Sequence, residues 1–233
     1  MHRAARGGKL RVMKRAIPYP PLLFGLLLLL AVDRRAAAEP AQVALAAFGA
    51  QVAAGLFYAL ARYRRETLWL VIVCLGLNWL GDSLDGTLAR VRRQPRPRFG
   101  FYVDHMVDVL GSIAMMTGLA FSGLVHPGVA MGMLIAFLAL ACESYLATYT
   151  VGRFELSQGL FGPTEIRLLL VLGNLKLLHN PWVTVLHHRV LLFDIGGTIG
   201  VAGMALVALV TMARHTAQLY REEPLLDREK PMS

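Results

Sequence analysis

The chain has 233 residues, of which 56% are hydrophobic and only 17% are charged, and its mean hydropathy is +0.52. These values argue against a soluble domain and place the chain among membrane proteins. The net charge of +9 does not indicate a nucleic-acid partner, because the basic residues lie in short segments between apolar runs. Membrane lipids with anionic head groups are the expected partners. Cys74 and Cys142 both lie in apolar runs, which predicts packing residues rather than a disulfide framework.

The N-terminal part reads as a basic stretch followed by a short apolar juxtamembrane segment. Residues 1–15 carry six Lys or Arg and no acid, which indicates a cytoplasmic location. The run 17–32 contains three prolines and keeps only eleven uninterrupted apolar residues, whereas a span needs roughly 20. We interpret this run as an interfacial or re-entrant helix. A tilted extra span and a signal-peptide core are the alternatives, and the charges of Asp33, Arg34 and Arg35 count against the signal peptide.

The remaining sequence predicts an all-α integral membrane bundle of about six transmembrane helices. The apolar runs have lengths that suit a hydrocarbon core about 30 Å thick. The expected spans are 41–62, 67–90, 101–124, 128–151, 164–180 and 189–213. They form one membrane domain over residues 41–213, between the N-terminal segment 1–40 and a polar cytoplasmic tail, 214–233, which begins as a helix extension.

Four aspartates interrupt two of these apolar runs within 27 residues. Asp82 and Asp85 are three residues apart, and Asp104 and Asp108 are four apart, so each pair lies on one face of its helix. Two prolines in the intervening segment VRRQPRPRF end the first helix and let the second fold back beside it. All four carboxylates can then converge between two neighbouring helices.

Such clustered carboxylates repel one another and are costly near a bilayer unless a cation neutralises them. Because the ligands would all be oxygens, Mg²⁺, Mn²⁺ or Ca²⁺ is favoured over zinc. A pair of such ions would attract a phosphate or pyrophosphate and stabilise the charge that develops during its transfer. Gly86 and Ala89 leave room for a ligand beside the backbone, and Arg90 adds a guanidinium that matches a phosphate. The alternative, a solvated helix end with chance acids, requires the same coincidence on two helices.

The pattern formed by these residues, together with Gly100, resembles the signature of the class I CDP-alcohol phosphotransferases. Members of that family are integral membrane enzymes. They move a phosphatidyl or phospho-alcohol group from a CDP-linked donor to an acceptor hydroxyl and release CMP. The motif itself covers about thirty residues, and the layout of the spans extends the similarity from roughly residue 40 to the C-terminus.

The resemblance implies a role for each motif residue. The ligands of the metals, two Mg²⁺ or Mn²⁺ ions, would be Asp82, Asp85 and Asp104, and the residues that hold CDP would be Gly86, Ala89 and Arg90. Asp108 would act as general base on the acceptor hydroxyl and also touch a metal. The implied partners are a CDP-linked lipid or alcohol donor and an alcohol acceptor in phospholipid biosynthesis, with a homodimer left open. The implied location is the bacterial inner membrane, with the active site facing the cytoplasm.

The basic loop between the two aspartate helices gives an independent indication of orientation. Its arginines are Arg92, Arg93, Arg96 and Arg98, and such a loop should face the cytoplasm. Alternation of the six spans then puts both termini on the cytoplasmic side, which agrees with the basic N-terminus if the run 17–32 does not cross the membrane. The arginines at positions 62, 64 and 65 would lie outside, as one exception to a rule that is only a bias.

One stretch departs from the family pattern. Many members carry Asn or Asp followed three residues later by Thr at the start of the span before the first aspartate helix, but this chain has EPAQVA at 39–44. The absence of these Asn or Asp and Thr side chains would remove a contact to the metal or nucleotide site. Asn78, one turn before Asp82, could supply part of that support, and it could equally be a buried Asn bonded to a neighbouring helix.

A few residues outside the acid pattern are candidates for acceptor binding or support. Glu143 is an acid in an apolar run that also holds Tyr145, which makes it a functional candidate. Glu165 and Arg167 follow on the same cytoplasmic side, and Glu165 could instead stabilise a helix N-terminus. Gly100 lies on the same face of the second aspartate helix as Asp104 and Asp108.

His105 lies beside Asp104 in the sequence but points about 100° away from it on a helix, so we interpret it as a neighbour rather than a ligand.

A membrane transporter or cation-binding protein, in which the acids form an ion path, is the alternative function. A path would distribute acids along the depth of several helices. Here all four lie at one membrane face and are accompanied by Gly, Ala and Arg suited to a phosphate ligand. The transferase is therefore the better interpretation.

Overall fold

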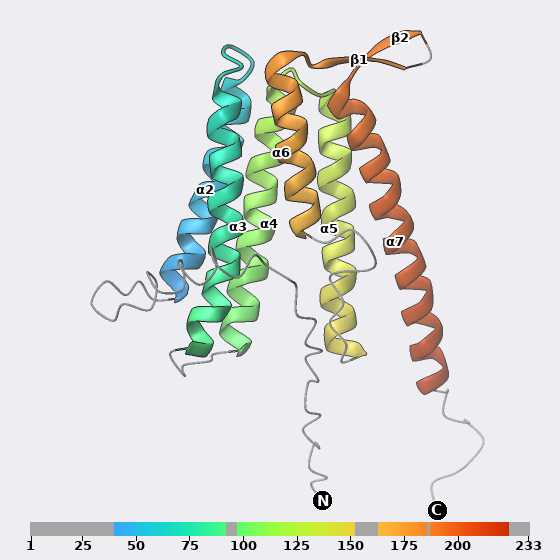
Figure 1. Cartoon of the computed structure of the whole chain (residues 1–233). Coiled ribbons are helices and arrows are strands. Elements are labelled where there is room, and N and C mark those ends of the chain that lie inside the picture. The colour runs from blue at the N-terminus through green and yellow to red at the C-terminus, as the bar shows by residue number, and fades with distance from the viewer. Residues whose placement is uncertain (1–39, 92–96, 152–162, 186, 224–233) are drawn as a thin grey trace, which may run out of the picture.

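The computed structural model describes residues 40–91, 97–151, 163–185 and 187–223. Within these ranges the chain forms a bundle of helices and one short hairpin (Figure 1). The elements are α2 (Pro40–Leu60), α3 (Thr67–Val91), α4 (Pro97–Phe121), α5 (Pro127–Thr150), α6 (Pro163–His179), β1 (Trp182–Val185), β2 (His188–Leu191) and α7 (Leu192–Glu222). The predicted all-α membrane bundle is confirmed. The predicted juxtamembrane segment at 17–32 lies outside the described residues.

The helices pack in an order that differs from their order in the sequence. α2 lies against both α3 and α4, α5 lies against α4 and α7, and α6 packs on α3. In Figure 1 the start of α2, the end of α3, the start of α4 and the ends of α5 and α7 all lie at the lower end of the bundle. The turns α2–α3 and α4–α5 and the hairpin lie at the upper end. Both aspartate helices therefore have their acidic ends at the same end of the molecule.

Small residues bring α2 unusually close to its two neighbours. A Cβ atom built on Gly118 of α4 would collide with the carbonyl oxygen of Gly55 on α2. A Cβ atom on Gly81 of α3 would lie 2.5 Å from the Cβ atom of Ala47 on α2. Helices in membranes associate through such close backbone packing, because lipid offers no hydrophobic force to drive them together. These contacts fix α3 and α4, which carry the acids, against one common helix.

Buried polar side chains add specific ties within the bundle. Gln51 of α2 donates to Ser112 of α4 at 3.4 Å, and Asn174 of α6 donates to the hydroxyl of Tyr58 on α2 at 2.8 Å. Asn174 and Tyr58 are completely buried, and Tyr58 belongs to the main hydrophobic cluster, which also contains Leu119. Buried polar groups need such partners, so each bond favours one arrangement of the helices.

The last predicted span, 189–213, begins three residues before the observed helix α7. Its first three residues lie in β2, which pairs antiparallel with β1 through Trp182↔Leu191 and Val185↔His188. β1 has the sequence WVTV, whose aromatic and β-branched residues suit a strand more than a helix, and β2 has the sequence HRVL. His187, in the turn, has a positive φ of 69°. The helix α7 then runs to Glu222, so the predicted helix extension after residue 213 is present.

Four of the helices are long and apolar enough to cross a membrane, judged by length and composition: Gln42–Leu60, Thr67–Leu84, Pro127–Thr150 and Leu192–Glu222. The two other described helices do not reach this criterion. α6 has only 17 residues, and the apolar stretch of α4 is interrupted by Asp104 and Asp108. That α4 and α6 also cross the membrane stays a prediction.

Candidate active site

The predicted acids lie toward the lower end of the bundle, where α3 ends and α4 begins (Figure 1). Asp82, Asp104 and Asp108 are all partly buried. α3 remains helical through Val91, so the helix predicted for the first half of the motif is observed. The side chains of the other predicted residues on this helix, Asp85, Gly86, Ala89 and Arg90, lie outside the described part of the structure.

Arg167 brings a third helix to the acids. Its Nη2 atom on α6 donates to Oδ2 of Asp82 on α3, and the two side chains are 17% and 28% exposed. The charge of Arg167 also acts on Asp104, and the charge of Asp104 acts on Asp82. Two predicted metal ligands and one arginine from three helices therefore converge.

An aromatic cluster closes the α5 side of this group. The ring of His105 stacks on Phe101 with centroids 4.1 Å apart and meets the ring of Tyr145 edge-on at 4.9 Å. Tyr145, on α5, is also close enough for the charges of Asp104 and Asp108 to act on it. The sequence had indicated Tyr145 only as a neighbour of Glu143.

His105 bonds to the backbone of α4 and also lies near an acid. Its Nδ1 atom lies 2.6 Å from the carbonyl oxygen of Phe101, one turn earlier on α4. Because a carbonyl oxygen only accepts, this bond needs the proton on Nδ1. The same nitrogen is 3.7 Å from Oδ2 of Asp104. His105 thus contacts the acid that precedes it, and its predicted part as a neighbour rather than a ligand stays a prediction.

Asn78, Gly100 and Glu165 are three of the residues predicted to bind the acceptor or to support the site. Asn78 is buried and donates to the carbonyl oxygen of Ala47 on α2 at 3.2 Å, which is the bond to a neighbouring helix that the sequence left as one alternative. Gly100 is exposed and has open space where a Cβ atom would lie. Glu165 is in the first turn of α6, and its side chain lies outside the described residues.

Glu143 is turned toward α7. Its Oε1 atom lies 2.5 Å from Nδ1 of His215, and the two side chains are 13% and 21% exposed. Glu143 and Tyr145 are two residues apart and so lie on nearly opposite sides of α5. Glu143 therefore joins α5 to α7, while Tyr145 faces α4. Sequence reasoning missed His215, although a lone His near the end of the last apolar run is a possible partner for an acid at membrane depth.

The described residues can be compared with what a metal site needs. Among the side chains that the structure describes, no three from His, Cys, Asp or Glu lie close enough together to hold a metal ion. The chemistry of the donor set still fits a hard cation, because Asp82 and Asp104 offer carboxylate oxygens from two helices. A positive group, the guanidinium of Arg167, already lies against them. The acids thus attract a cation at this place.

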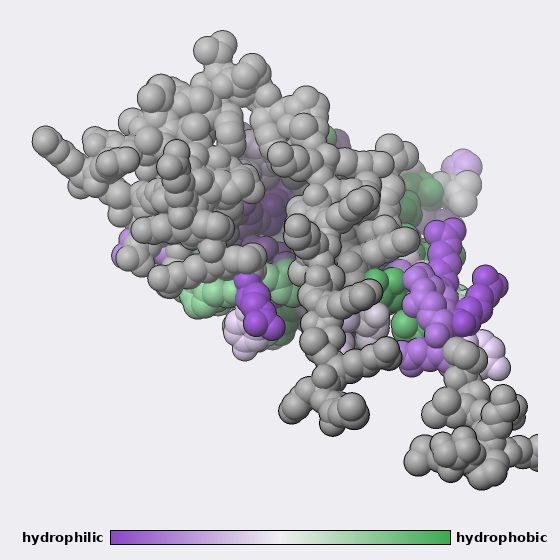
Figure 2. Space-filling model, turned by 90° about the horizontal axis from the view of Figure 1, so that it is seen from below, coloured by the Kyte–Doolittle hydropathy of each residue, from purple (hydrophilic) through white to green (hydrophobic). Residues whose placement is uncertain are grey.

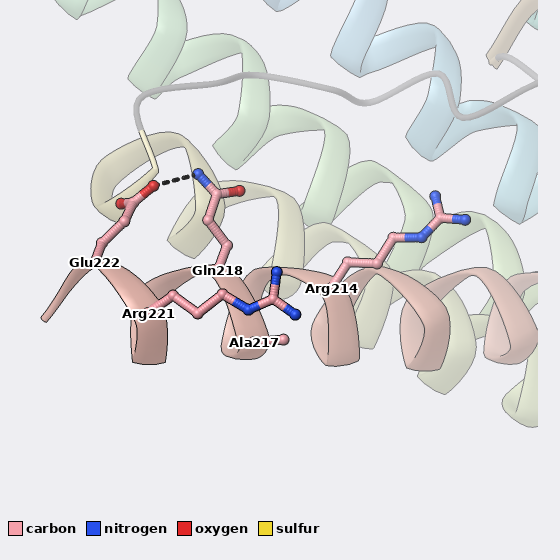
Figure 3. A pocket seen from close by; sticks show the side chains of 5 residues that line it. All are labelled: Arg214, Ala217, Gln218, Arg221 and Glu222. Carbon is pink, nitrogen blue, oxygen red and sulfur yellow. Dashed lines mark hydrogen bonds between the residues drawn. The ribbon is translucent and has the colours of Figure 1, made fainter. Parts of the chain in front are cut away.

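A pocket with a volume of about 460 Å³ lies at the lower end of α7, apart from these acids (Figure 3). Its described lining comes from one helix: Arg214, Ala217, Gln218, Arg221 and Glu222. Gln218 donates to Glu222 at 2.8 Å. Figure 2, which views the molecule from below, shows hydrophilic residues gathered at this end of α7. None of the predicted site residues is in this lining, so the acids define the candidate active site.

The fold and the site together define an integral membrane helix bundle. Toward one end of it, acids from two helices lie close together, and an arginine from a third helix contacts one of them. Comparison with known proteins gives the family. Residues 39–215 match the family model of the CDP-alcohol phosphatidyltransferases, and the chain belongs to this family. The family is a class of membrane-integral transferases that act on CDP-alcohols in phospholipid synthesis. The resemblance found in the sequence is therefore confirmed.

One curated protein is also similar to this chain. The chain is 34% identical over 117 residues to an uncharacterized protein of Aquifex aeolicus (strain VF5), a match that covers 48% of this chain and 58% of that protein. The chain thus spans less than two thirds of the length of this relative. No solved structure matches the chain.

Proposed function

We propose that this protein transfers a phosphatidyl or phospho-alcohol group from a CDP-linked donor to an acceptor hydroxyl, with release of CMP, and that the transfer depends on a divalent metal. The observation that carries the proposal is the convergence of Asp82, Asp104 and Arg167 from three helices. Carboxylates can hold the divalent cations that accompany phosphate esters, and an arginine can donate to the phosphate oxygens. Membership of the family favours this transfer over an ion path.

The residues that would hold Mg²⁺ or Mn²⁺, as two ions, are Asp82, Asp85 and Asp104, with Asp108 also in contact. When bound, the ions would polarise the pyrophosphate of the donor and neutralise the charge that develops on it. The carboxylates need this partner, because clustered charges at a membrane are costly without neutralisation.

The chain's own groups would orient the two substrates. Gly86 and Ala89 have small side chains that let the CDP part approach the helix backbone, and Arg90 would donate to a phosphate oxygen through two N–H groups. Asp108 would accept the proton of the acceptor hydroxyl as its oxygen attacks the phosphorus. The new P–O bond forms to the acceptor, and the P–O bond to CMP breaks.

The same proposal includes a location and an orientation. The acids would face the cytoplasm of a bacterial cell from its inner membrane, because the basic loop at 92–98 adjoins them in the sequence. A CDP-lipid donor could then diffuse to the site within the membrane. The acceptor would arrive from the aqueous phase or from the membrane, according to its chemistry, and a homodimer remains part of the proposal.

CMP release tests the proposed function. The purified full chain, in detergent–lipid micelles, is incubated with a panel of CDP-linked lipid and alcohol donors and hydroxyl acceptors, with Mg²⁺ or with a chelator. We expect CMP only when donor, acceptor and Mg²⁺ are all present, and none from an Asp104→Asn variant assayed in parallel. Donor consumption that is equal with and without the metal would contradict the proposal, as would a complete lack of CMP across the panel.

A further inference from the structure

We propose that Arg167 is an exchangeable counter-ion of Asp82: it neutralises the acid while no metal is bound, and a divalent cation must displace it to bind. This inference rests on the proposed metal-dependent function and adds to it a residue that competes with the metal. The starting observation is the bond from Nη2 of Arg167 to Oδ2 of Asp82. A guanidinium and a metal ion are both positive and compete for the same carboxylate.

Burial makes this ion pair more than a surface contact. The side chains of Arg167 and Asp82 are 17% and 28% exposed, so solvent screens the pair less than it screens an exposed one. The charge of Arg167 also reaches Asp104 on α4. One arginine therefore offsets two acids that repel each other, and its departure would leave both without this neutralising charge. A divalent cation supplies the replacement charge.

The position of Arg167 on α6 allows its side chain to leave without moving the helix. Leu170, Asn174 and Leu177 follow it at intervals of three, seven and ten residues, so all four lie on one face of α6. Those three residues are buried, and Asn174 is bonded to Tyr58 of α2. The backbone is thus anchored C-terminal to Arg167. Its long side chain can rotate about several bonds, so the exchange needs no movement of a helix.

The competition has a measurable consequence for metal affinity. If Arg167 occupies Asp82 in the metal-free protein, removal of the guanidinium makes the carboxylate more available and also removes a repulsive positive charge. An arginine that served only to hold α6 against α3 would have the opposite effect, because its loss would loosen the site and weaken metal binding. The sign of the change therefore separates the two roles.

The first test is Mn²⁺ binding to the full chain in detergent, measured without substrate from the electron paramagnetic resonance signal of free Mn²⁺. We expect Arg167→Gln to bind Mn²⁺ at least about tenfold more tightly than the wild type, a change of about 1.4 kcal/mol. Arg98→Gln is the matched control, because Arg98 is an exposed arginine near the start of α4. It should bind Mn²⁺ as the wild type does. Unchanged or weaker binding by Arg167→Gln would overturn the inference.

The second test uses the wild-type protein and so does not depend on whether a variant folds. Arginine side chains are modified with phenylglyoxal, and the modified peptides are quantified by mass spectrometry with and without Mn²⁺. We expect Mn²⁺ to increase the modification of Arg167 and to leave that of Arg98 unchanged. Modification of Arg167 that stays the same or falls would overturn the exchange. If the wild type binds no Mn²⁺ at all, the proposed metal-dependent function fails, which is a different result from metal binding that ignores Arg167.

Discussion

Asn174 of α6 donates a hydrogen bond of 2.8 Å to the hydroxyl oxygen of Tyr58 on α2, and both side chains are completely buried. Arg167 lies seven residues before Asn174 and therefore on the same face of α6. The bond thus ties to the bundle the helix that carries an arginine to the acids. Among the described atoms, Oδ1 of Asn174 has no hydrogen-bond partner, so the Tyr58 bond is the main polar tie of this amide.

We expect Tyr58→Phe to lower the free energy of unfolding by about 1–3 kcal/mol, because the amide of Asn174 would stay buried without its acceptor. Thermal unfolding in detergent measures the loss. Tyr63→Phe is the control, since Tyr63 is 81% exposed at the α2–α3 turn. The double variant Tyr58→Phe/Asn174→Leu should cost less than Tyr58→Phe alone, because it leaves neither polar partner buried without the other. Equal stability of Tyr58→Phe and the control would refute this account of the bond.

The sequence predicted the helices well because their signals are local. Prolines precede or begin α4, α5 and α6, and apolar runs of span length define the rest. The hairpin was missed because its residues follow one apolar run and lead directly into another. Neither strand, Trp182–Val185 (WVTV) or His188–Leu191 (HRVL), alternates polar and apolar residues, and four residues are too few to stand out against a span.

The partners of the site residues could not be predicted in the same way. Periodicity places Asp82 on a face of α3, but it does not say that α6 covers that face. The contact with Arg167 depends on helix packing between segments 85 residues apart. Glu143 shows the same limit. It lies in the same apolar run as Tyr145, and nothing in that run indicates that its carboxylate faces His215 on α7. Tertiary packing, which one sequence does not encode locally, decides both cases.

Glu143 should contribute to stability and not to the transfer. Glu143→Gln removes the charge next to His215, and we expect a lower unfolding temperature with CMP release per folded molecule close to that of the wild type. A double-mutant cycle with His215→Gln should give a coupling of about 0.5–3 kcal/mol, as for residues in contact. Loss of CMP release in a variant of unchanged stability would instead make Glu143 a candidate for acceptor binding.

The metal site makes the strongest prediction about activity. Asp82→Asn or Asp104→Asn would remove a charged group from the proposed metal site, so either change should abolish metal-dependent CMP release. Glu66→Gln is a suitable control, because this exposed acid lies at the α2–α3 turn, at the opposite end of the bundle. Release near the wild-type rate by either aspartate variant would remove that residue from the metal site.

The orientation of the bundle is testable with single cysteines. Gln94→Cys and Arg96→Cys fall in the basic loop, outside the described residues, in a background in which Cys74 and Cys142 are replaced by Ala. We expect a membrane-impermeant thiol reagent to label them only from the cytoplasmic side. Arg64→Cys, at the α2–α3 turn, should be labelled only from the other side. Labelling of positions 94 and 96 from outside would reverse the orientation.

The general base is the remaining chemical role, and Asp108 is the residue proposed for it. Asp108 lies one helical turn beyond Asp104, farther from the start of α4, and its charge reaches Tyr145 on α5. It is therefore separated along the bundle from Arg90, near the end of α3, where the CDP part would bind. An acceptor hydroxyl between these positions could align for attack opposite the leaving CMP, with its proton accepted by a carboxylate within hydrogen-bond reach.

Asp108→Asn keeps the shape of the side chain but removes its basicity. Since general-base catalysis contributes roughly 10²–10⁴ in rate, we expect turnover to fall by at least that order. Binding of the CDP donor and of Mn²⁺ should be largely retained, because Asp82, Asp85 and Asp104 would still hold the metals. Rapid-quench measurement of CMP release, combined with equilibrium binding of a labelled donor, separates the two effects. If donor and metal binding disappeared together with turnover, Asp108 would be mainly a metal ligand. The base would then have to come from another acid, and Glu165 would be the next to test, because Glu143 is engaged by His215.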